Sequence, residues 1–284
     1  MEVKGRILKG VAGQYTVDTP QGQYICSARG LFRKNKISPI VGDWVEINTE
    51  GEESGQLMAI LPRRNELRRP KVANVDQILI VLATAQPAFS FTMLDRYLMQ
   101  AELEDIDTAI CINKIDLKAS VAAEVCDIYE KIGYTVFSVS VHESEGHGLS
   151  QVREYLQAKT TVLAGPSGVG KSSMINLLTG QENMATGLVS EKIGRGKHTT
   201  RHAEFIPISS GAYVIDTPGF SSLDLPDIPI EERAGLFREF FPYLGQCKFS
   251  DCIHNKEQDC AVKEQVGLDI HPNRYARYVE WLNT

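Results

Sequence analysis

A glycine-rich segment that ends in a lysine and a serine carries the clearest chemistry in this sequence. It reads GPSGVGKS over 165–172 and lies between an apolar run at 161–164 and a helix-like run at 173–178. Such a loop offers backbone N–H groups and the positive end of a helix to phosphates. Lys171 would neutralise the β- and γ-phosphates, and the Ser172 hydroxyl would ligate Mg²⁺. The predicted nucleotide contacts, preferred over a glycine-rich turn without function, are Gly165, Pro166, Ser167, Gly168, Val169, Gly170, Lys171, Ser172 and Ser173.

A second polar segment, Asn113-Lys114-Ile115-Asp116, follows an apolar run at 108–112. Guanine presents two donors on one edge, N1–H and the exocyclic amine, and the carboxylate of Asp116 can accept both. Adenine lacks this pair, so a buried Asp116 would be left unpaired at a large cost in free energy. Ser140 follows the next predicted strand, at 134–139, where a short polar segment is expected to cover the base. These residues predict a site for a guanine nucleotide.

The segment Asp216-Thr-Pro-Gly219 ends another predicted strand, at 212–215. Beside a phosphate loop, Asp216 can hold Mg²⁺ through water and the Gly219 amide can contact a γ-phosphate. Residues 193–201 are polar and contain glycine, which is typical of a switch that orders around γ-phosphate and Mg²⁺. An ordinary exposed loop is the alternative. Thr199 or Thr200 would supply a magnesium ligand there, and we favour Thr200.

The order of the three motifs is unusual. Ordinary GTPases run from phosphate loop to DxxG to NKxD, whereas here NKID comes first and DTPG last. A site assembled from loops at one edge of a sheet does not depend on where the chain is cut. Many GTPases place a water-orienting glutamine directly after DxxG, but this chain has Phe220 there. His198, beside the two threonines, is therefore the candidate catalytic residue, with an RNA-facing histidine as the alternative.

A cluster of metal-binding residue types lies near the C-terminus. Cys247, Cys252, His254 and Cys260 fall within fourteen residues. Three thiols and one imidazole form a closed tetrahedral set suited to structural Zn²⁺, and crowded cysteines in a cytoplasmic protein favour a metal over disulfides. We predict one zinc ion per chain, with a reduced, metal-free set as the alternative.

The elements that must position these residues fall into three segments. Residues 1–66 contain short β-prone runs at 5–10, 14–18, 23–27 and 42–47, which suit a small β-barrel such as an OB-fold; an SH3-like barrel fits equally well. Residues 67–222 alternate strands and helices, and the apolar run at 77–83 is typical of a parallel strand covered on both faces. Residues 223–284 place helices at 231–241 and 273–282 around the cysteines. The predicted fold class is α/β: a permuted phosphate-loop GTPase domain with an N-terminal OB-like barrel and a C-terminal helical zinc-binding domain.

The distribution of charged residues along the chain indicates whether it binds nucleic acid. The net charge of −6 by itself argues against nucleic acid, but residues 1–71 carry 12 Lys and Arg against 8 Asp and Glu. This asymmetry predicts an RNA-binding module, against the alternatives of a solvated surface and, for the second cluster, a solvated linker. No run approaches the ~20 apolar residues that span a bilayer, and residues 1–5 lack the apolar core of a signal peptide, so we expect a cytoplasmic protein without a membrane partner. We also expect it to be a monomer. The candidate phosphate contacts are Arg29, Arg33, Lys34 and Lys36 in one loop and Arg63, Arg64, Arg68 and Arg69 further on.

Together these residues resemble the ribosome small-subunit-dependent GTPase A family, bacterial GTPases with circularly permuted motifs. The resemblance covers almost the whole chain and rests on the motif order and the Cys/Cys/His/Cys spacing. It implies GTP hydrolysis stimulated by the 30S subunit, a role in late 30S maturation, contact with 16S ribosomal RNA, and the same catalytic histidine, His198. One departure is that residues 142–148, after Ser140, form a slightly longer segment than the family pattern. The family's guanine-nucleotide positions carry over to Asn113, Lys114, Asp116, 165–173, 194–200 and 216–219, and its zinc ligands to the four cluster residues.

Two other functions fit the sequence less well. The chain could be an RNA-binding scaffold that holds GTP but barely hydrolyses it, in which case 30S subunits would not stimulate phosphate release. It could also be a DNA-binding zinc-finger regulator with a nucleotide sensor, which would not protect ribosomal RNA.

Overall fold

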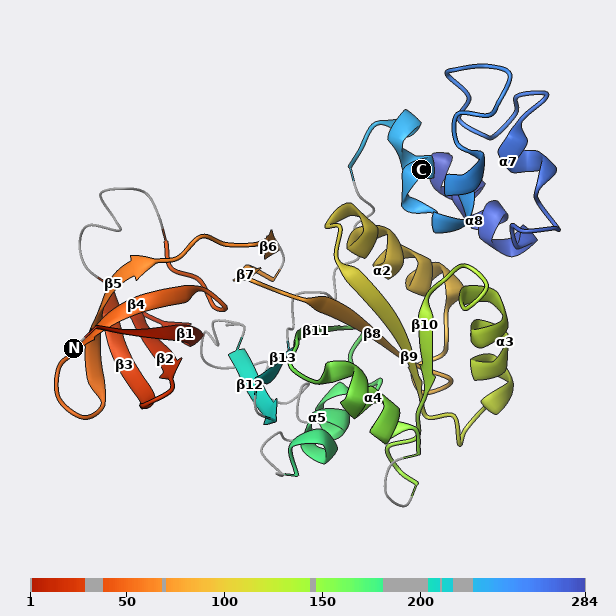
Figure 1. Cartoon of the computed structure of the whole chain (residues 1–284). Helices are drawn as coiled ribbons and strands as arrows, with labels where there is room; N and C mark the ends of the chain where they lie inside the picture. The colour runs from red at the N-terminus through yellow and green to blue at the C-terminus, as the bar shows by residue number, and fades with distance from the viewer. Residues whose placement is uncertain are drawn as a thin grey trace, which may run out of the picture.

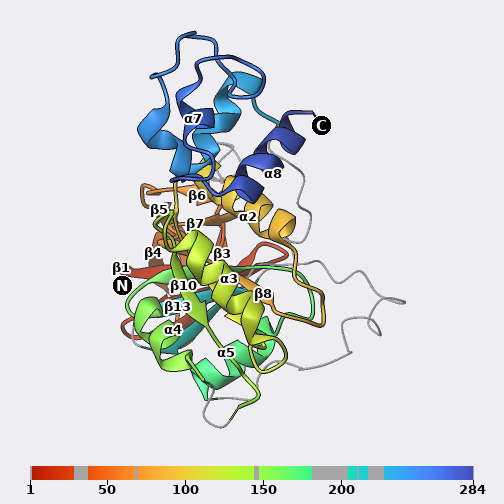
Figure 2. The same cartoon turned by 90° about the vertical axis from the view of Figure 1, so that its right-hand side faces the viewer.

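The computed structural model describes residues 2–28, 38–67, 70–143, 147–180, 204–209, 211–216 and 227–283. These form a β-barrel, a central sheet with helices on both faces, and a C-terminal lobe (227–283) that rests on helix α2, as both views show (Figures 1 and 2). Within these ranges, every helix is too short or too polar to span a membrane.

The barrel is closed, and its strand order is β1-β2-β3-β5-β4. Strand β3 runs parallel to β5, and β4 closes the barrel by pairing antiparallel with β1. This five-stranded arrangement is that of an OB-fold, which decides between the two barrels that the sequence left open. The strands are β1 (Glu2–Val11), β2 (Gln14–Thr19), β3 (Gly22–Ala28), β4 (Trp44–Thr49) and β5 (Ser54–Ile60).

The central sheet has six strands in the order β10-β9-β8-β11-β13-β12. The first five are parallel, so their carboxyl ends meet at one edge, and only β12 pairs antiparallel, with β13. All seven residues of β8 are buried, as the apolar run at 77–83 predicted. The strands are β8 (Gln77–Ala83), β9 (Asp107–Asn113), β10 (Thr135–Ser138), β11 (Thr160–Ala164), β12 (Glu204–Ser209) and β13 (Ala212–Asp216).

Helices cover both faces of this sheet. On one face α2 and α3 pack against alternate residues of β8 and β9, and on the other α4 and α5 pack against the intervening residues. Each of these helices thus belongs to a connection between two parallel strands and covers one buried face of the sheet. The helices are α2 (Phe91–Leu103), α3 (Ala119–Tyr129), α4 (Leu149–Leu156) and α5 (Lys171–Thr179).

The C-terminal lobe differs from its predicted structure at one place. The sequence predicts one helical segment over 231–241, whereas the chain forms two 3₁₀ helices separated by the extended residue Phe237. Phe237 is buried against the distant residues Tyr278 and Trp281, so tertiary packing overrides the helical spacing, and Pro242 lies within the second 3₁₀ helix. The lobe contains η2 (Ile230–Leu236), η3 (Arg238–Tyr243), α7 (Ala261–Glu264) and α8 (Pro272–Leu282), the last as predicted.

The lobe docks on α2 through buried charges. Arg274 of α8 donates two hydrogen bonds to the carboxylate of Glu239, at 2.6 and 2.8 Å, and one to Asp95 of α2, at 2.5 Å. Asp95 also accepts hydrogen bonds from Tyr129 and Arg277. The lobe and the central sheet are therefore joined by an ionic network, not by apolar contact alone.

The barrel meets the sheet at the β12–β13 hairpin. Arg6 of β1 is buried, donates to the Thr160 hydroxyl at 2.7 Å, and holds its guanidinium 4.7 Å from the ring centroid of Phe205. Tyr213 donates to Asp18 of β2 at 3.0 Å. The barrel thus contacts the hairpin that follows the predicted switch at 193–201 and ends at Asp216, the first residue of DTPG.

Candidate functional site

Three predicted motifs converge at the carboxyl edge of the central sheet. The NKID segment begins at the end of β9, the phosphate loop follows β11, and DTPG begins at the last residue of β13. Strand β11 pairs with β13 so that Leu163 lies opposite Asp216, and β9 pairs with β8 so that Asn113 lies opposite Ala83. Parallel pairing therefore brings together segments that lie far apart along the chain.

The phosphate loop owes its shape to glycines that have no room for a side chain. A Cβ atom on Gly165, at φ +136°, would lie 2.0 Å from the carbonyl oxygen of Val81. One on Gly170, at φ +99°, would lie 2.3 Å from Asn113 Nδ2. Helix α5 begins at Lys171, whose Nζ donates to the carbonyl oxygens of Gly165 and Pro166 at 2.7 and 2.8 Å. The ammonium group thus lies against the loop that would cradle the phosphates.

The NKID segment is bonded to the phosphate loop. Asn113 is fully buried and donates from Nδ2 to the carbonyl oxygen of Val169 at 2.8 Å. Lys114 Nζ donates to the carbonyl oxygen of Gly168 at 2.8 Å, and also to that of Gln86. The segment expected to hold the base and the loop expected to hold the phosphates are therefore one connected structure.

Asp116 and Ser140 lie next to each other. The buried Ser140 donates from Oγ to Asp116 Oδ1 at 2.6 Å. The carboxylate of Asp116 is itself exposed, contrary to the buried carboxylate assumed from the sequence. A nucleotide base must therefore supply the burial on which discrimination against adenine depends.

Several predicted residues lie outside the described part of the chain. For Asp216 the backbone alone is described. The predicted site residues outside it are those at 194–200, which include His198, Thr199 and Thr200, and those at 217–219, together with Phe220. The same holds for the basic candidates Arg29, Arg33, Lys34, Lys36, Arg68 and Arg69.

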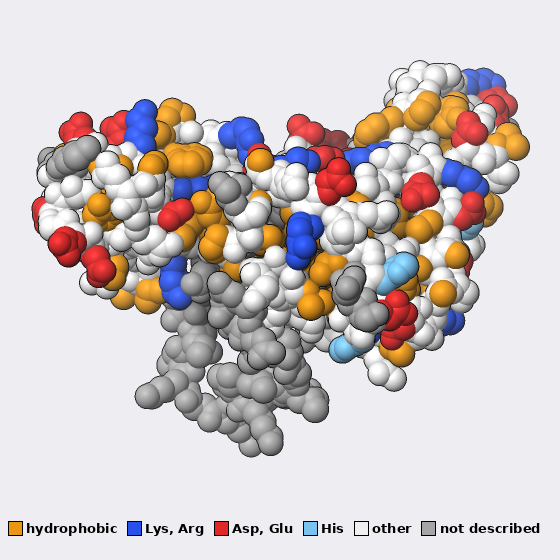
Figure 3. Space-filling model, turned by 60° about the horizontal axis from the view of Figure 1, so that its bottom comes forward, with side chains coloured by type: hydrophobic (Ala, Val, Ile, Leu, Met, Phe, Trp, Pro, Cys, Tyr) orange, Lys and Arg blue, Asp and Glu red, His pale blue; other side chains and the backbone are white. Residues whose placement is uncertain are grey.

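The two basic candidates that are described make internal contacts. Arg63 donates to Asp43 Oδ1 at 2.7 Å and Oδ2 at 2.9 Å, and Arg64 pairs with Asp76 at 2.8 Å. Arg63 also contacts Glu66, so it stabilises the connection that follows β5. On the face shown in Figure 3, the described Lys and Arg side chains are dispersed among acidic ones and form no single patch.

Residues that the sequence reasoning missed support this edge. Thr84, directly after β8, donates its N–H to the carbonyl oxygen of Asn113 at 3.0 Å and its hydroxyl to that of Lys114. Val141 N–H donates to Asn113 Oδ1 at 3.3 Å. Thr84 belongs to no motif, but a polar residue after a fully apolar parallel strand lies at the ligand-binding edge of such sheets. The position of Thr84 directly after the apolar run at 77–83 could therefore have identified it from the sequence.

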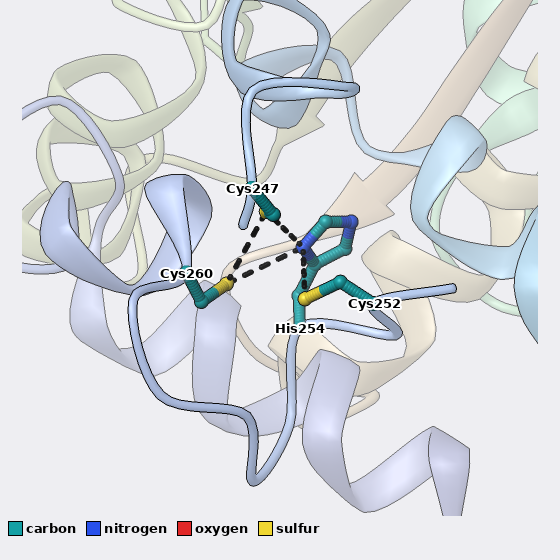
Figure 4. Close-up of side chains that lie close together, drawn as sticks. All are labelled: Cys247, Cys252, His254 and Cys260. Atoms are coloured by element: carbon teal, nitrogen blue, oxygen red, sulfur yellow. Dashed lines mark hydrogen bonds between the residues drawn. The ribbon is translucent and has the colours of Figure 1, made fainter. Parts of the chain in front are cut away.

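The predicted metal-binding residues also come together (Figure 4). His254 Nδ1 lies 3.4, 3.5 and 3.4 Å from the sulfur atoms of Cys247, Cys252 and Cys260, and the sulfurs of Cys247 and Cys260 are 3.8 Å apart. All four ligand atoms lie within 4.8 Å of one another. Tetrahedral zinc with Zn–S of about 2.3 Å and Zn–N of about 2.0–2.1 Å separates its ligand atoms by roughly 3.5–3.8 Å. The cluster therefore fits a metal ion of this size.

Burial adjusts the protonation of these ligands. It raises the pKa of the Cys252 thiol to about 12 and raises that of Cys260, and it lowers the pKa of His254. At neutral pH the thiols of Cys252 and Cys260 therefore hold protons, which a cation must displace to bind. The three thiols and one imidazole of the cluster are a donor set suited to a cation such as Zn²⁺.

The loop that carries the ligands is held by hydrogen bonds from α8. His254 has a left-handed backbone, at φ +59°. Its carbonyl oxygen accepts from Tyr275 at 2.9 Å, and that of Ile253 accepts from Tyr278 at 2.7 Å. Glu257 accepts the N–H of Ile253 at 3.1 Å. The two bonds from Tyr275 and Tyr278 are not visible in the spacing of the ligands, because they come from a helix about twenty residues away.

Comparison with known proteins gives one consistent result. A family model described as RsgA GTPase matches residues 60–226, and one described as RsgA N-terminal domain matches residues 4–57. The chain is 45% identical to the small ribosomal subunit biogenesis GTPase RsgA of Caldanaerobacter subterraneus subsp. tengcongensis, over 99% of this chain and 94% of that protein. It is 43% identical to the protein of the same name from Bacillus subtilis, over 98% and 96%.

Solved structures agree over the full length. The crystal structure of YjeQ from Thermotoga maritima superposes with a TM-score of 0.85 at 34% identity, covering 100% of this chain and 98% of that one. The crystal structure of YloQ, described as a circularly permuted GTPase, gives a TM-score of 0.81 at 38% identity, covering 100% and 94%.

Proposed function

This chain belongs to the RsgA GTPase family, and from that premise we propose that it hydrolyses GTP to GDP and phosphate while assisting the late maturation of the 30S ribosomal subunit. The observation that carries the proposal is the convergence of NKID, the phosphate loop and DTPG at one sheet edge in permuted order. The relatives named for small-subunit biogenesis supply the partner class.

The guanine base is held by the NKID segment and Ser140, and the phosphates by residues 165–173. Mg²⁺, when bound with GTP, neutralises phosphate charge, and Ser172 and Thr200 are its proposed ligands. Asn113 and Lys114 support this arrangement from the protein side, since both are bonded to carbonyl oxygens of the phosphate loop. The Gly219 amide and Asp216 complete the γ-phosphate end of the site.

The hydrolytic water is proposed to be oriented by His198, because Phe220 after DTPG can neither donate nor accept a hydrogen bond. In a GTP-turnover assay with and without purified 30S subunits, we expect the subunits to stimulate the wild-type protein. The His198→Ala variant should keep its affinity for GTP and for the subunit and lose most of the stimulated rate. A variant that binds normally and turns over at the wild-type stimulated rate would remove His198 from catalysis.

The same assay tests the competing function. Absence of stimulation in the wild-type protein would favour an RNA scaffold that holds GTP with little hydrolysis. Protection of 16S ribosomal RNA from chemical probing would separate either of these from a DNA-binding regulator.

The Cys/His cluster is proposed to hold one structural Zn²⁺ per chain, because its four donors leave no position for a reactive water. Cys252→Ser should abolish stoichiometric zinc in metal analysis and loosen the lobe, while GDP affinity changes little because the nucleotide site lies on other elements. Cys126→Ser, which removes a thiol outside the cluster, is the matched control and should retain the metal. Reduced wild-type protein that contains no zinc would refute this proposal.

We propose three domains with separate functions. The barrel over 1–66 contacts 16S ribosomal RNA, residues 67–222 form the GTPase domain, and residues 223–284 form the zinc-binding domain. The closed OB-type barrel supports the first assignment, because such barrels bind nucleic acids. We further propose that the protein acts as a monomer in the cytoplasm, where ribosomal subunits mature.

A further inference from the structure

Thr84 makes two hydrogen bonds to the segment that reads the base. It lies directly after β8, and its side chain is buried at 3% exposure. Its N–H donates to the carbonyl oxygen of Asn113 at 3.0 Å, and its hydroxyl donates to that of Lys114. Thirty residues separate Thr84 from Lys114, so this is a long-range contact between the end of β8 and the NKID segment.

The backbone at Lys114 explains why such a contact is needed. Lys114 has φ +59°, in the left-handed region that disfavours residues with a side chain. Its carbonyl oxygen accepts from two donors, the Thr84 hydroxyl and the Leu117 N–H at 3.0 Å. The local turn supplies one of these bonds, and Thr84 supplies the other from a neighbouring strand.

The orientation of this turn decides where the base-binding side chains lie. The side chain of Asn113 is hydrogen-bonded to Val169 of the phosphate loop, and the carboxylate of Asp116 is hydrogen-bonded to Ser140. If Lys114 relaxed to an ordinary backbone conformation, the chain direction would change between these two residues. The base-reading carboxylate would then be displaced from its position relative to the phosphate loop.

We propose that Thr84 is a positioning residue for guanine-nucleotide binding, whose hydroxyl fixes the left-handed turn at Lys114 and so orients residues 113–116. This inference rests on the proposed function, because it concerns the same guanine site. Thr84 acts through the backbone of the NKID segment, to which both of these hydrogen bonds are made.

The chain offers a matched control for this idea. Thr108 is also 3% exposed, and its hydroxyl also donates to a backbone carbonyl, that of Ile106, at 2.9 Å. It lies near the start of β9, whereas the NKID segment begins at the end of the same strand. Thr84→Val and Thr108→Val therefore remove equivalent buried hydroxyls at opposite edges of one sheet.

The experiment measures the dissociation constant of a fluorescent GDP analogue in Mg²⁺ buffer and the thermal unfolding midpoint of each full-length variant. Both valine variants should lower the unfolding midpoint by similar amounts. Thr84→Val should weaken GDP about tenfold, which corresponds to about 1.4 kcal/mol, and Thr108→Val should leave the affinity unchanged. Thr84→Ser, which keeps the hydroxyl, should restore the wild-type affinity. At saturating GTP and 30S subunits, kcat of Thr84→Val should equal that of the wild type, so that its effect falls on KM.

The outcomes are distinct. Equal GDP affinities for the wild type and Thr84→Val, or equal losses in both valine variants, would overturn the inference. If Thr84→Val does not fold, Thr84→Ala replaces it, and an affinity equal to that of Thr84→Ser would overturn the inference in the same way. Failure of the wild-type protein to bind GDP would overturn the proposed function, and this inference with it.

Discussion

Replacement of Asp116 by asparagine should change the base preference of the nucleotide site from guanine to xanthine. Ser140 donates its hydroxyl to Asp116 Oδ1, so an asparagine placed there is held by its own oxygen and directs its amide N–H₂ toward the base. That amide opposes the exocyclic amine of guanine, donor to donor, but it can donate to the oxygen that replaces this amine in xanthine. The geometry at Ser140 thus fixes which end of the amide faces the nucleotide.

The expected effect is large. A hydrogen bond to a charged group contributes about 1.5–3 kcal/mol, and the variant exchanges one such bond for a repulsive contact. We expect GTP affinity to fall at least about 100-fold, equivalent to roughly 3 kcal/mol, and xanthosine triphosphate to become the preferred ligand in a competition assay. Asp107→Asn, which removes an exposed carboxylate from the opposite end of β9, should leave the preference unchanged. An unaltered preference in Asp116→Asn would disprove the assignment of the base-reading residue.

Replacement of Arg274 by methionine should strongly destabilise the C-terminal lobe. The side chains of Arg274, Asp95 and Glu239 are exposed by only 1%, 2% and 3%. Burial by itself lowers the pKa of Arg274, but the carboxylates of Asp95 and Glu239 more than offset this and raise it well above its ordinary value. Removing the guanidinium leaves Glu239 without either of its hydrogen bonds to Arg274, whereas Asp95 retains Arg277.

The cost of breaking a buried ion pair by removing one partner is about 3–5 kcal/mol. Denaturant unfolding can follow the lobe alone in a Trp44→Phe background, because the chain has two tryptophans and Trp281 lies buried in the lobe. Lys131→Met breaks an exposed pair with Asp127 on the sheet side and should cost at most about 1 kcal/mol. If Arg274→Met cost no more than Lys131→Met, the ionic network would not be what holds the lobe in place.

The candidate sites of this protein were largely visible in short stretches of its sequence. The phosphate loop, the NKID segment and the three cysteines with His254 each consist of residues that are close in sequence, so their spacing marks them as candidates. The apolar run at 77–83 also predicted a buried parallel strand correctly, since a strand covered on both faces must be apolar throughout. The permuted motif order was visible for the same reason, because it depends only on position along the chain.

The tertiary structure decided what depends on contacts between distant residues. The sequence could not separate an OB-fold from an SH3-like barrel, because the distinction lies in which strands pair, here β3 with β5 and β1 with β4. It predicted one helix over 231–241, but burial of Phe237 against Tyr278 and Trp281 divides that segment into two 3₁₀ helices. It did not reveal Thr84 or Arg274, whose partners lie 30 and 179 residues away. A motif can be recognised from sequence because its residues lie close together along the chain. A hydrogen bond between distant residues forms only when folding brings its donor and acceptor together.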